Sequence, residues 1–176
     1  MKNVRRSTWL LRGEVGSGAI AEFGPAMLIF VVIVLLPLIG MLTLADGVGT
    51  LYFATAQAAR AAGPSNSSTE AVSNMRNMAK AIIGGPLGAF ARIDPANESG
   101  MSIKILRLAV NGSTVEPFGP LLPLPSASWI DTGKYFYEYQ VTATGYTVSP
   151  LFWPGRAVPF TFTSSCTVEH PEGLSQ

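Results

Sequence analysis

A run of twenty-three residues without an ionisable side chain, Phe23 to Ala45, most limits what this chain can fold into. As a helix that rises about 1.5 Å per residue, the run reaches about 34 Å, slightly more than the hydrocarbon core of a bilayer. Fourteen of its residues are Leu, Ile, Val or Phe, and together they favour membrane insertion by about 6 kcal/mol. The run therefore predicts a transmembrane helix.

Two other structures can carry a long apolar run, a buried core helix and a removable secretory signal. Core helices rarely hold more than about 14 consecutive apolar residues. A secretory signal has a shorter apolar region that ends in a small-residue cleavage site, whereas this run ends at "LADGVG" and continues into helix-like sequence. Both alternatives fit the residues less well than a membrane anchor.

The charges around the run predict its orientation. Four basic residues and one acid, Glu14, precede it, and by the positive-inside rule this end stays in the cytoplasm. The segment after the helix, about 130 residues, is then exported. Its single cysteine, Cys166, can form no internal disulfide, so the exported part must be held together by packing. We expect Cys166 to be a small buried residue on a strand.

The helical pattern continues beyond the membrane run. Small and apolar residues recur at spacings of three and four as far as Ala62, and Gly63 and Pro64 then end the pattern. The polar, glycine-containing stretch 46–49 marks the point where the helix leaves lipid. We therefore divide the chain into a basic leader (1–18), a transmembrane and extended helix (19–62) and an exported domain (63–176). The alanine-rich second half of the helix permits close packing, either with another subunit's helix or within its own core.

A second helix and several strands follow. Ser67 and Glu70 have the spacing of a capping box, and Gly84 and Gly85 end the helix. Its expected apolar stripe is Val72, Met75, Met78 or Ala79, and Ile82.

Alternating residues predict strands over 101–110 and 134–148 and near 158–170, with a hairpin turn at Asn111 and Gly112 after the first. The proline-rich segment around 117–125 predicts a loop. The fold class is thus α+β: a long N-terminal transmembrane helix that extends into a small exported domain with a second helix and a three- to four-stranded antiparallel sheet.

The chain offers few groups for chemistry. It has one histidine, His170, in a polar tail, and no cluster of Cys, His, Asp or Glu has metal-ligand spacing. No glycine-rich phosphate loop follows a strand, and no basic patch with interleaved aromatic residues suggests nucleic acid. We expect a protein that is not an enzyme and that needs no cofactor or metal.

The most specific feature is the segment "GSGAIAEFGPAM", Gly16 to Met27, which places Glu22 and Phe23 at the start of the apolar run. A basic leader, small residues with Gly16 and Gly18, a Glu-Phe pair and a long apolar helix together resemble the class III signal of type IV pilin-like proteins. The resemblance is closest to TadE-like minor pilins, or pseudopilins, of the tight-adherence (Flp) pilus system. It covers residues 13 to about 63 and includes the "ARAAG" that ends the helix.

The resemblance implies a subunit that a prepilin peptidase trims on the cytoplasmic side of the bacterial inner membrane, and that joins other pilin-like subunits and the pilus assembly machinery. Cutting after Gly18 would make Ala19 the first residue and Glu22 the fourth, whereas cutting after Gly16 would make Glu22 the sixth. The family spacing places a glycine where Ser17 stands. The cleavage site therefore stays open between the two glycines.

Glu22 has a physical role on this interpretation. A carboxylate that enters apolar surroundings costs several kcal/mol unless it is paired. The α-amino group that cleavage frees on a neighbouring subunit can supply the pair, with an attraction of about 4 kcal/mol at 4 Å and an effective dielectric constant near 20. Otherwise, Glu22 is an interfacial side chain that reaches headgroup water.

Two other functions compete with a pilin-like subunit. The first is a single-pass, membrane-anchored periplasmic module that binds a ligand or protein, with Trp129, Tyr135, Tyr137 and Tyr139 lining a cleft. The second is an anchored enzyme, for which catalytic groups are scarce.

Overall fold

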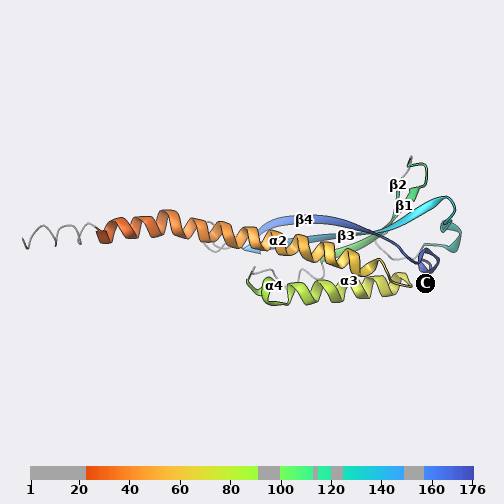
Figure 1. The fold of residues 1–176 in the computed structure, drawn as a ribbon, viewed down its shortest axis with the longest axis horizontal. Helices are drawn as coiled ribbons and strands as arrows, with labels where there is room; N and C mark the ends of the chain where they lie inside the picture. The colour runs from red at the N-terminus through yellow and green to blue at the C-terminus, as the bar shows by residue number, and fades with distance from the viewer. Residues whose placement is uncertain (1–22, 91–99, 113–114, 120–124, 149–156) are drawn as a thin grey trace, which may run out of the picture.

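The computed structural model describes residues 23–90, 100–112, 115–119, 125–148 and 157–176 of the chain. It is a long rod with a folded domain packed along one half (Figure 1). The predicted α+β fold is confirmed, with a long N-terminal apolar helix, a further helix and a four-stranded antiparallel sheet.

One helix runs from Phe23 to Ala62. It contains a π-helical turn, η1 (Val31–Leu35), in which the Leu36 N–H bonds to the Val31 carbonyl, and it continues as α2 (Leu36–Ala62). Pro37 explains the wider turn, because proline has no N–H and its ring clashes with the carbonyl four residues earlier. The helix continues without a break through 46–49.

The end of α2 and the start of the next helix were predicted correctly. Gly63 caps α2, and its N–H bonds to the Ala59 carbonyl at 3.3 Å. Helix α3 (Ser68–Ile83) begins at the capping box, where Ser67 Oγ accepts from the Glu70 N–H at 3.2 Å and Glu70 Oε2 accepts from the Asn66 N–H at 2.8 Å. A short helix, α4 (Pro86–Phe90), follows.

The apolar stripe of α3 differs from the prediction in part. Met75 is buried, but Met78 is exposed, so the interpretation of Met78 as core filler is wrong. Helix α3 runs antiparallel to α2 (Figure 1), and its most buried apolar residues lie four apart: Ala71, Met75, Ala79 and Ile83. Val72 and Ile82 are half-buried beside them.

The sheet has the order β2-β1-β3-β4, and all of its pairings are antiparallel. Its strands are β1 (Met101–Ala109), β2 (Val115–Phe118), β3 (Tyr135–Val148) and β4 (Ala157–Thr167). The hairpin turn at Gly112 has the predicted left-handed backbone, with φ of 72°. Pro117 lies in β2, which tolerates a proline because β2 is an edge strand. A 3₁₀ turn, η3 (Ala127–Trp129), precedes β3.

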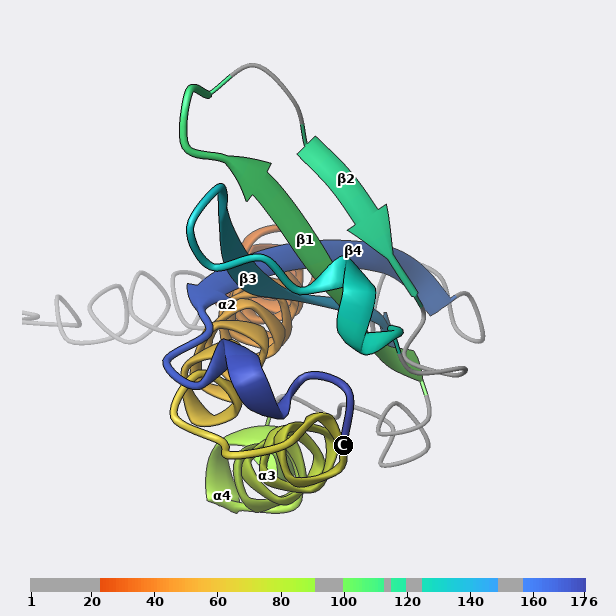
Figure 2. The ribbon, with the colours of Figure 1, turned by 90° about the vertical axis from the view of Figure 1, so that its right-hand side faces the viewer.

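The domain has three layers, seen end-on in Figure 2: the sheet, then α2, then α3. Ile103, Ile105, Tyr139 and Val141 on the inner face of the sheet belong to the same buried core as α2, and all are at most 4% exposed. On α2, the buried side chains are mainly alanines: Ala54, Ala58, Ala59 and Ala62. The small side chains therefore serve the core of the same chain, and residues 51–62 of the helix are part of the folded domain.

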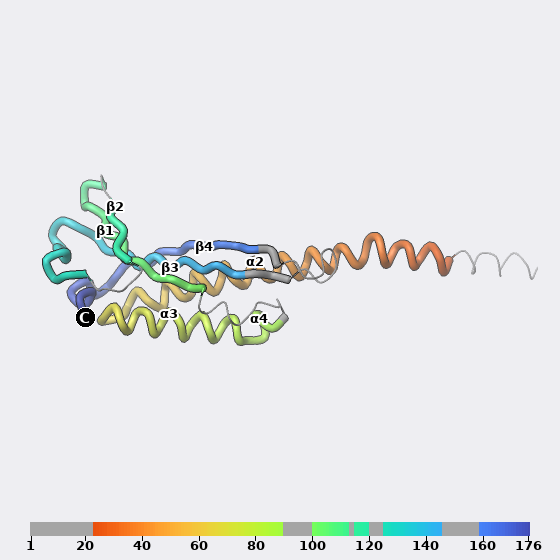
Figure 3. The backbone as a smooth tube through the Cα atoms, turned by 180° about the vertical axis from the view of Figure 1, so that it is seen from behind, coloured from red at the N-terminus to blue at the C-terminus, as the bar shows by residue number. Residues whose placement is uncertain are grey.

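The C-terminal segment closes the end of the domain away from the bare part of the helix (Figure 3). After η4 (Pro171–Gly173), Leu174 is fully buried and its carbonyl accepts from Ser68 Oγ at 2.6 Å. A Cβ added at Gly173 would lie 1.7 Å from the Asn66 carbonyl oxygen. Only glycine fits this close approach of two backbones.

We expect Gly173→Ala to destabilise the domain by about 1–3 kcal/mol, because the added methyl group must push two backbone segments apart. The matched control is Gly49→Ala, whose Cβ would meet nothing within 4 Å and whose position in a helix favours alanine. Thermal unfolding of the detergent-solubilised chain, followed by near-ultraviolet circular dichroism, measures both. Equal midpoints for the two variants would contradict the tight contact at Gly173.

Candidate functional site

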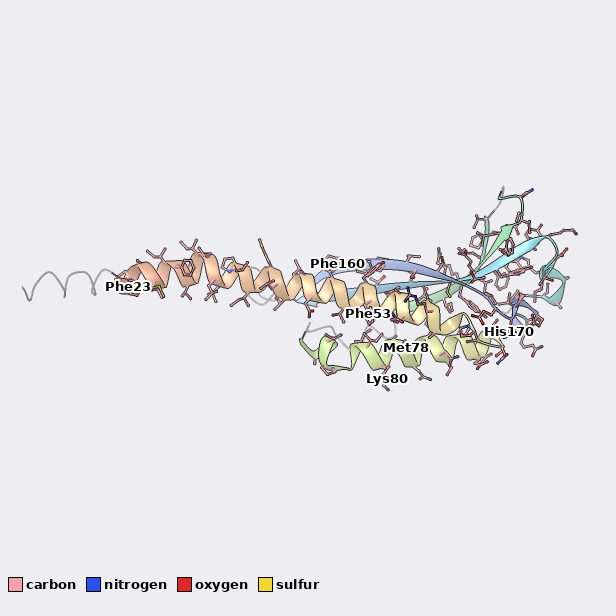
Figure 4. All side chains as sticks on the ribbon, viewed as in Figure 1. Phe23, Phe53, Met78, Lys80, Phe160 and His170 are labelled. Atoms are coloured by element: carbon pink, nitrogen blue, oxygen red, sulfur yellow. The ribbon has the colours of Figure 1, made fainter. Side chains whose placement is uncertain are left out.

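The predicted site residues fall at the start of the helix. Gly16, Gly18, Ala19 and Glu22 lie outside the described residues. Phe23 is the first described residue, and its side chain is 63% exposed at the end of the rod (Figure 4). The structure therefore places only one of the two predicted assembly residues, on the bare end of the helix.

The N-terminal half of the helix has little protein around it. The helix is long and apolar enough to cross a membrane, and 6% of its most apolar window is buried. Large side chains are exposed all around this half: Met27, Leu28, Ile29, Phe30, Val32, Ile33, Val34, Leu35, Leu38, Ile39, Met41 and Leu42. A core helix would bury such side chains, so the bare surface favours lipid or other helices as its environment.

The exposed apolar surface continues past the end of the uncharged run. Tyr52 is 59% and Phe53 46% exposed, and Gly49 lies nearby with open space beside it. Phe162 on β4 contacts the Tyr52 ring edge-on, with 5.8 Å between ring centroids. Phe53 and Phe160 are labelled on this part of the rod in Figure 4. The side of α2 beyond the uncharged run thus presents aromatic side chains that the domain covers only in part.

Asp46 lies where the uncharged run ends. One of its carboxylate oxygens, Oδ2, is buried and has no hydrogen-bond partner among the described residues, and the residue as a whole is only partly exposed. A buried carboxylate oxygen without a partner is costly. The uncharged run thus has an acid at each boundary in the sequence: Glu22 precedes it and Asp46 follows it.

The aromatic residues considered as a ligand cleft have other positions. Tyr137 and Tyr139 are 2% and 1% exposed in the core. Trp129 and Tyr135 lie against the Arg107 guanidinium, whose Cζ is 4.8 Å and 4.3 Å from their ring centroids. These four side chains therefore fill the protein and hold its loops in place.

Arg107 joins three elements at this point. Its Nη1 donates to the Trp129 carbonyl at 3.0 Å, and its Nη2 bonds to the Glu116 carboxylate on β2. Tyr137 Oη adds a bond to the same Trp129 carbonyl at 3.2 Å. The cluster holds η3 and β2 against β1 and β3, so its role is structural.

Few described residues have the chemistry of a reactive site. Within the described ranges, no three His, Cys, Asp or Glu residues lie close enough to hold a metal ion. His170 pairs with Glu172, and its Nδ1 is 3.3 Å from Oε1. Cys166 lies on β4 as predicted and is half-buried beside Gly63, and burial raises the pKa of its thiol. A protonated thiol is a poor nucleophile.

Tyr139 gives the domain a measurable pH dependence. Burial raises the pKa of its phenol from 10.0 to about 12, and Ser68 hydrogen-bonds to it. The folded domain keeps this proton where the unfolded chain releases it. The resulting stabilisation is complete below pH 10 and is lost as the pH rises to about 12. Denaturant unfolding just below pH 10 and near pH 12 should show a smaller loss for Tyr139→Phe than for the natural chain; equal losses would contradict it.

No family model matches the chain, and no curated protein or solved structure is significantly similar to it. The functional argument therefore depends on the residues and the geometry described above.

Proposed function

We propose that this chain is a structural subunit of the minor pilin or pseudopilin kind, which acts in assembly of a tight-adherence (Flp) pilus and is anchored in the bacterial inner membrane by its N-terminal helix. The resemblance of residues 13 to about 63 to TadE-like proteins supplies the system and the partners. Those partners are a prepilin peptidase, other pilin-like subunits and the assembly machinery.

One observation in the structure supports a building element over a simple anchor. The same unbroken helix that is bare from Phe23 to Leu42 becomes the central layer of the domain from Leu51 onwards. A tether needs only to span lipid, and a flexible linker after residue 45 would be enough for it. Here, one continuous helix belongs both to the apolar segment and to the domain, which suits a subunit whose helix packs beside others.

The exposed aromatic side chains Tyr52 and Phe53 add to this support. They lie beyond the uncharged run, where water would surround them in a solitary chain. Large apolar side chains that remain exposed in this way mark contact surfaces. Neighbouring pilin-like helices would cover them in an assembly.

The mature N-terminus tests the proposal directly. Cleavage after Gly18 removes four basic residues and one acid, so the net charge falls from +1 to −2. We expect mass spectrometry of the membrane-extracted protein to find a chain that begins at Ala19, or at Ser17 if the cut follows Gly16. A host with an inactive prepilin peptidase is the control and should yield the intact chain. A full-length protein in both hosts would contradict processing and favour an anchored binding module.

A further inference from the structure

The outer face of the sheet carries an apolar groove. It lies at the end of the sheet near the β1–β2 turn, which Figure 1 shows to be the end farthest from the bare helix. We call it the tip groove; it measures about 370 Å³ and is lined chiefly by Leu108, Val115, Phe136, Glu138 and Thr167. The strand register explains how these residues meet. Leu108 pairs with Val115 on β2 and with Phe136 on β3, which makes an apolar row across three strands. Glu138 and its partner Thr167 on β4 form the polar end.

The apolar row is not part of the core. The layers α2 and α3 cover the opposite face of the sheet. The residues that alternate with the apolar row, such as Tyr137 on β3, point to that covered face. Phe136 is 60% and Val115 58% exposed, and Val110 nearby is 57% exposed. Exposed large apolar side chains that gather in one place mark an interaction site.

The rest of the outer face shows that the sheet does not require such residues there. Farther along β3 and β4, this face is built from threonines that hydrogen-bond across the strands, with 3.2 Å between Thr142 and Thr163 and 3.3 Å between Thr144 and Thr161. Around these threonine pairs the outer face is thus polar, whereas the tip is apolar.

Charge defines the occupant further. Glu138 makes no ion pair with any described residue. A carboxylate at the end of an apolar row favours a partner that presents a cation next to an apolar side chain. The groove opens to solvent on one face of a sheet, whereas pockets for small molecules enclose most of their ligand. A protein segment fits better.

We propose that the tip groove docks a segment of another protein, in which a large apolar side chain lies on Leu108, Val115 and Phe136 and an adjacent lysine or arginine pairs with Glu138. This docking site lies at the opposite end of the molecule from the membrane helix and does not depend on leader processing or on Glu22.

A peptide library displayed on phage, selected against the full chain in nanodiscs, tests the proposal. We expect enriched peptides to contain a Phe, Leu, Ile or Met next to a Lys or Arg. Phe136→Ala should weaken the binding of a selected peptide about thirtyfold, as for a central contact residue. Glu138→Lys should weaken it at least tenfold, and changing the peptide's cation to Glu should restore binding to this variant. Thr144→Ala, on the same face but outside the groove, should leave affinity unchanged.

Three results would overturn the proposal. The first is a set of peptides without the paired apolar and basic residues, or with affinities that Phe136→Ala and Glu138→Lys do not change. The second is self-association of the nanodisc-bound chain that Phe136→Ala abolishes, because the occupant would then be a second copy. The third is binding of peptide-free lipid vesicles through the same residues. Because all three variants lie on the exposed face, unchanged thermal midpoints will show that any loss of binding is not caused by unfolding.

Discussion

Replacing Glu22 by alanine is expected to reduce recovery of this chain in assembled fibres at least a hundredfold. On the proposed function, the carboxylate pairs in an apolar setting with the α-amino group of a trimmed neighbour. Removing one partner of a buried ion pair costs about 3–5 kcal/mol because the other charge is left unpaired, and 3 kcal/mol already exceeds a factor of 100. Quantitative immunoblotting of sheared fibres against the membrane fraction measures the change.

The matched control is Glu14→Ala, the same substitution in the leader that processing removes. It should leave assembly unchanged. A cleavage-resistant chain, with Gly16 and Gly18 both replaced, provides a stricter test because it lacks the free amine. Adding Glu22→Ala to this chain should cause little further loss, since the two groups act as one pair. A Glu22→Ala chain that assembles normally would show that this acid only reaches headgroup water.

Leu51→Ala is expected to destabilise the folded domain by about 3 kcal/mol and to lower its thermal midpoint by roughly 10 °C. Leu51 is 1% exposed where α2 passes closest to β3, and a Cβ added at Gly145 would lie 2.6 Å from its Cδ2. Truncation removes this contact and leaves a cavity between helix and sheet. Scanning calorimetry of the detergent-solubilised chain measures the loss.

An exposed leucine provides the comparison for Leu51. Leu87 on α4 is 55% exposed, so Leu87→Ala removes the same atoms from a site with little packing and should change the midpoint by only a degree or two. Similar losses for the two variants would mean that the helix does not support the sheet as described. Unchanged stability for Leu51→Ala would contradict the fusion of membrane helix and domain on which the proposed function depends.

Several elements could be predicted because their signals are local. Gly63 and Pro64 end α2, the Ser67 and Glu70 pair begins α3, and strict alternation gives β1 and β3. Each signal depends on a few neighbouring residues and a fixed period. Tertiary contacts did not need to be known.

Other features depend on contacts between distant segments. The stripe of α3 could not be placed to within one residue, because the packing angle against α2 decides whether Met78 or Ala79 is buried. The bond between Ser68 and Leu174 joins residues 106 apart, and nothing local to either indicates it. The π-helical turn before Pro37 was not predicted, because the apolar pattern does not distinguish it from an α-helical turn.

The candidate sites divide in the same way. Glu22 and the leader glycines attract attention in the sequence because a charge and small residues stand beside an apolar run, yet they lie outside the described residues. The tip groove was missed because alternation assigns Leu108 and Phe136 to the outer face without showing that β2 places Val115 beside them. A large apolar residue at an outward strand position is the signal that could have found it.

The unbroken helix has a mechanical consequence. Because one helix continues from the apolar half into the centre of the domain, a rotation of the apolar half about its own axis would turn the sheet with it. Helices that pack against Phe23 and its neighbours would fix the rotation of the rod about its long axis. They would therefore also fix the direction in which Phe136 faces. A rotation imposed on the apolar half would change the orientation of the tip groove without any change in the shape of the subunit.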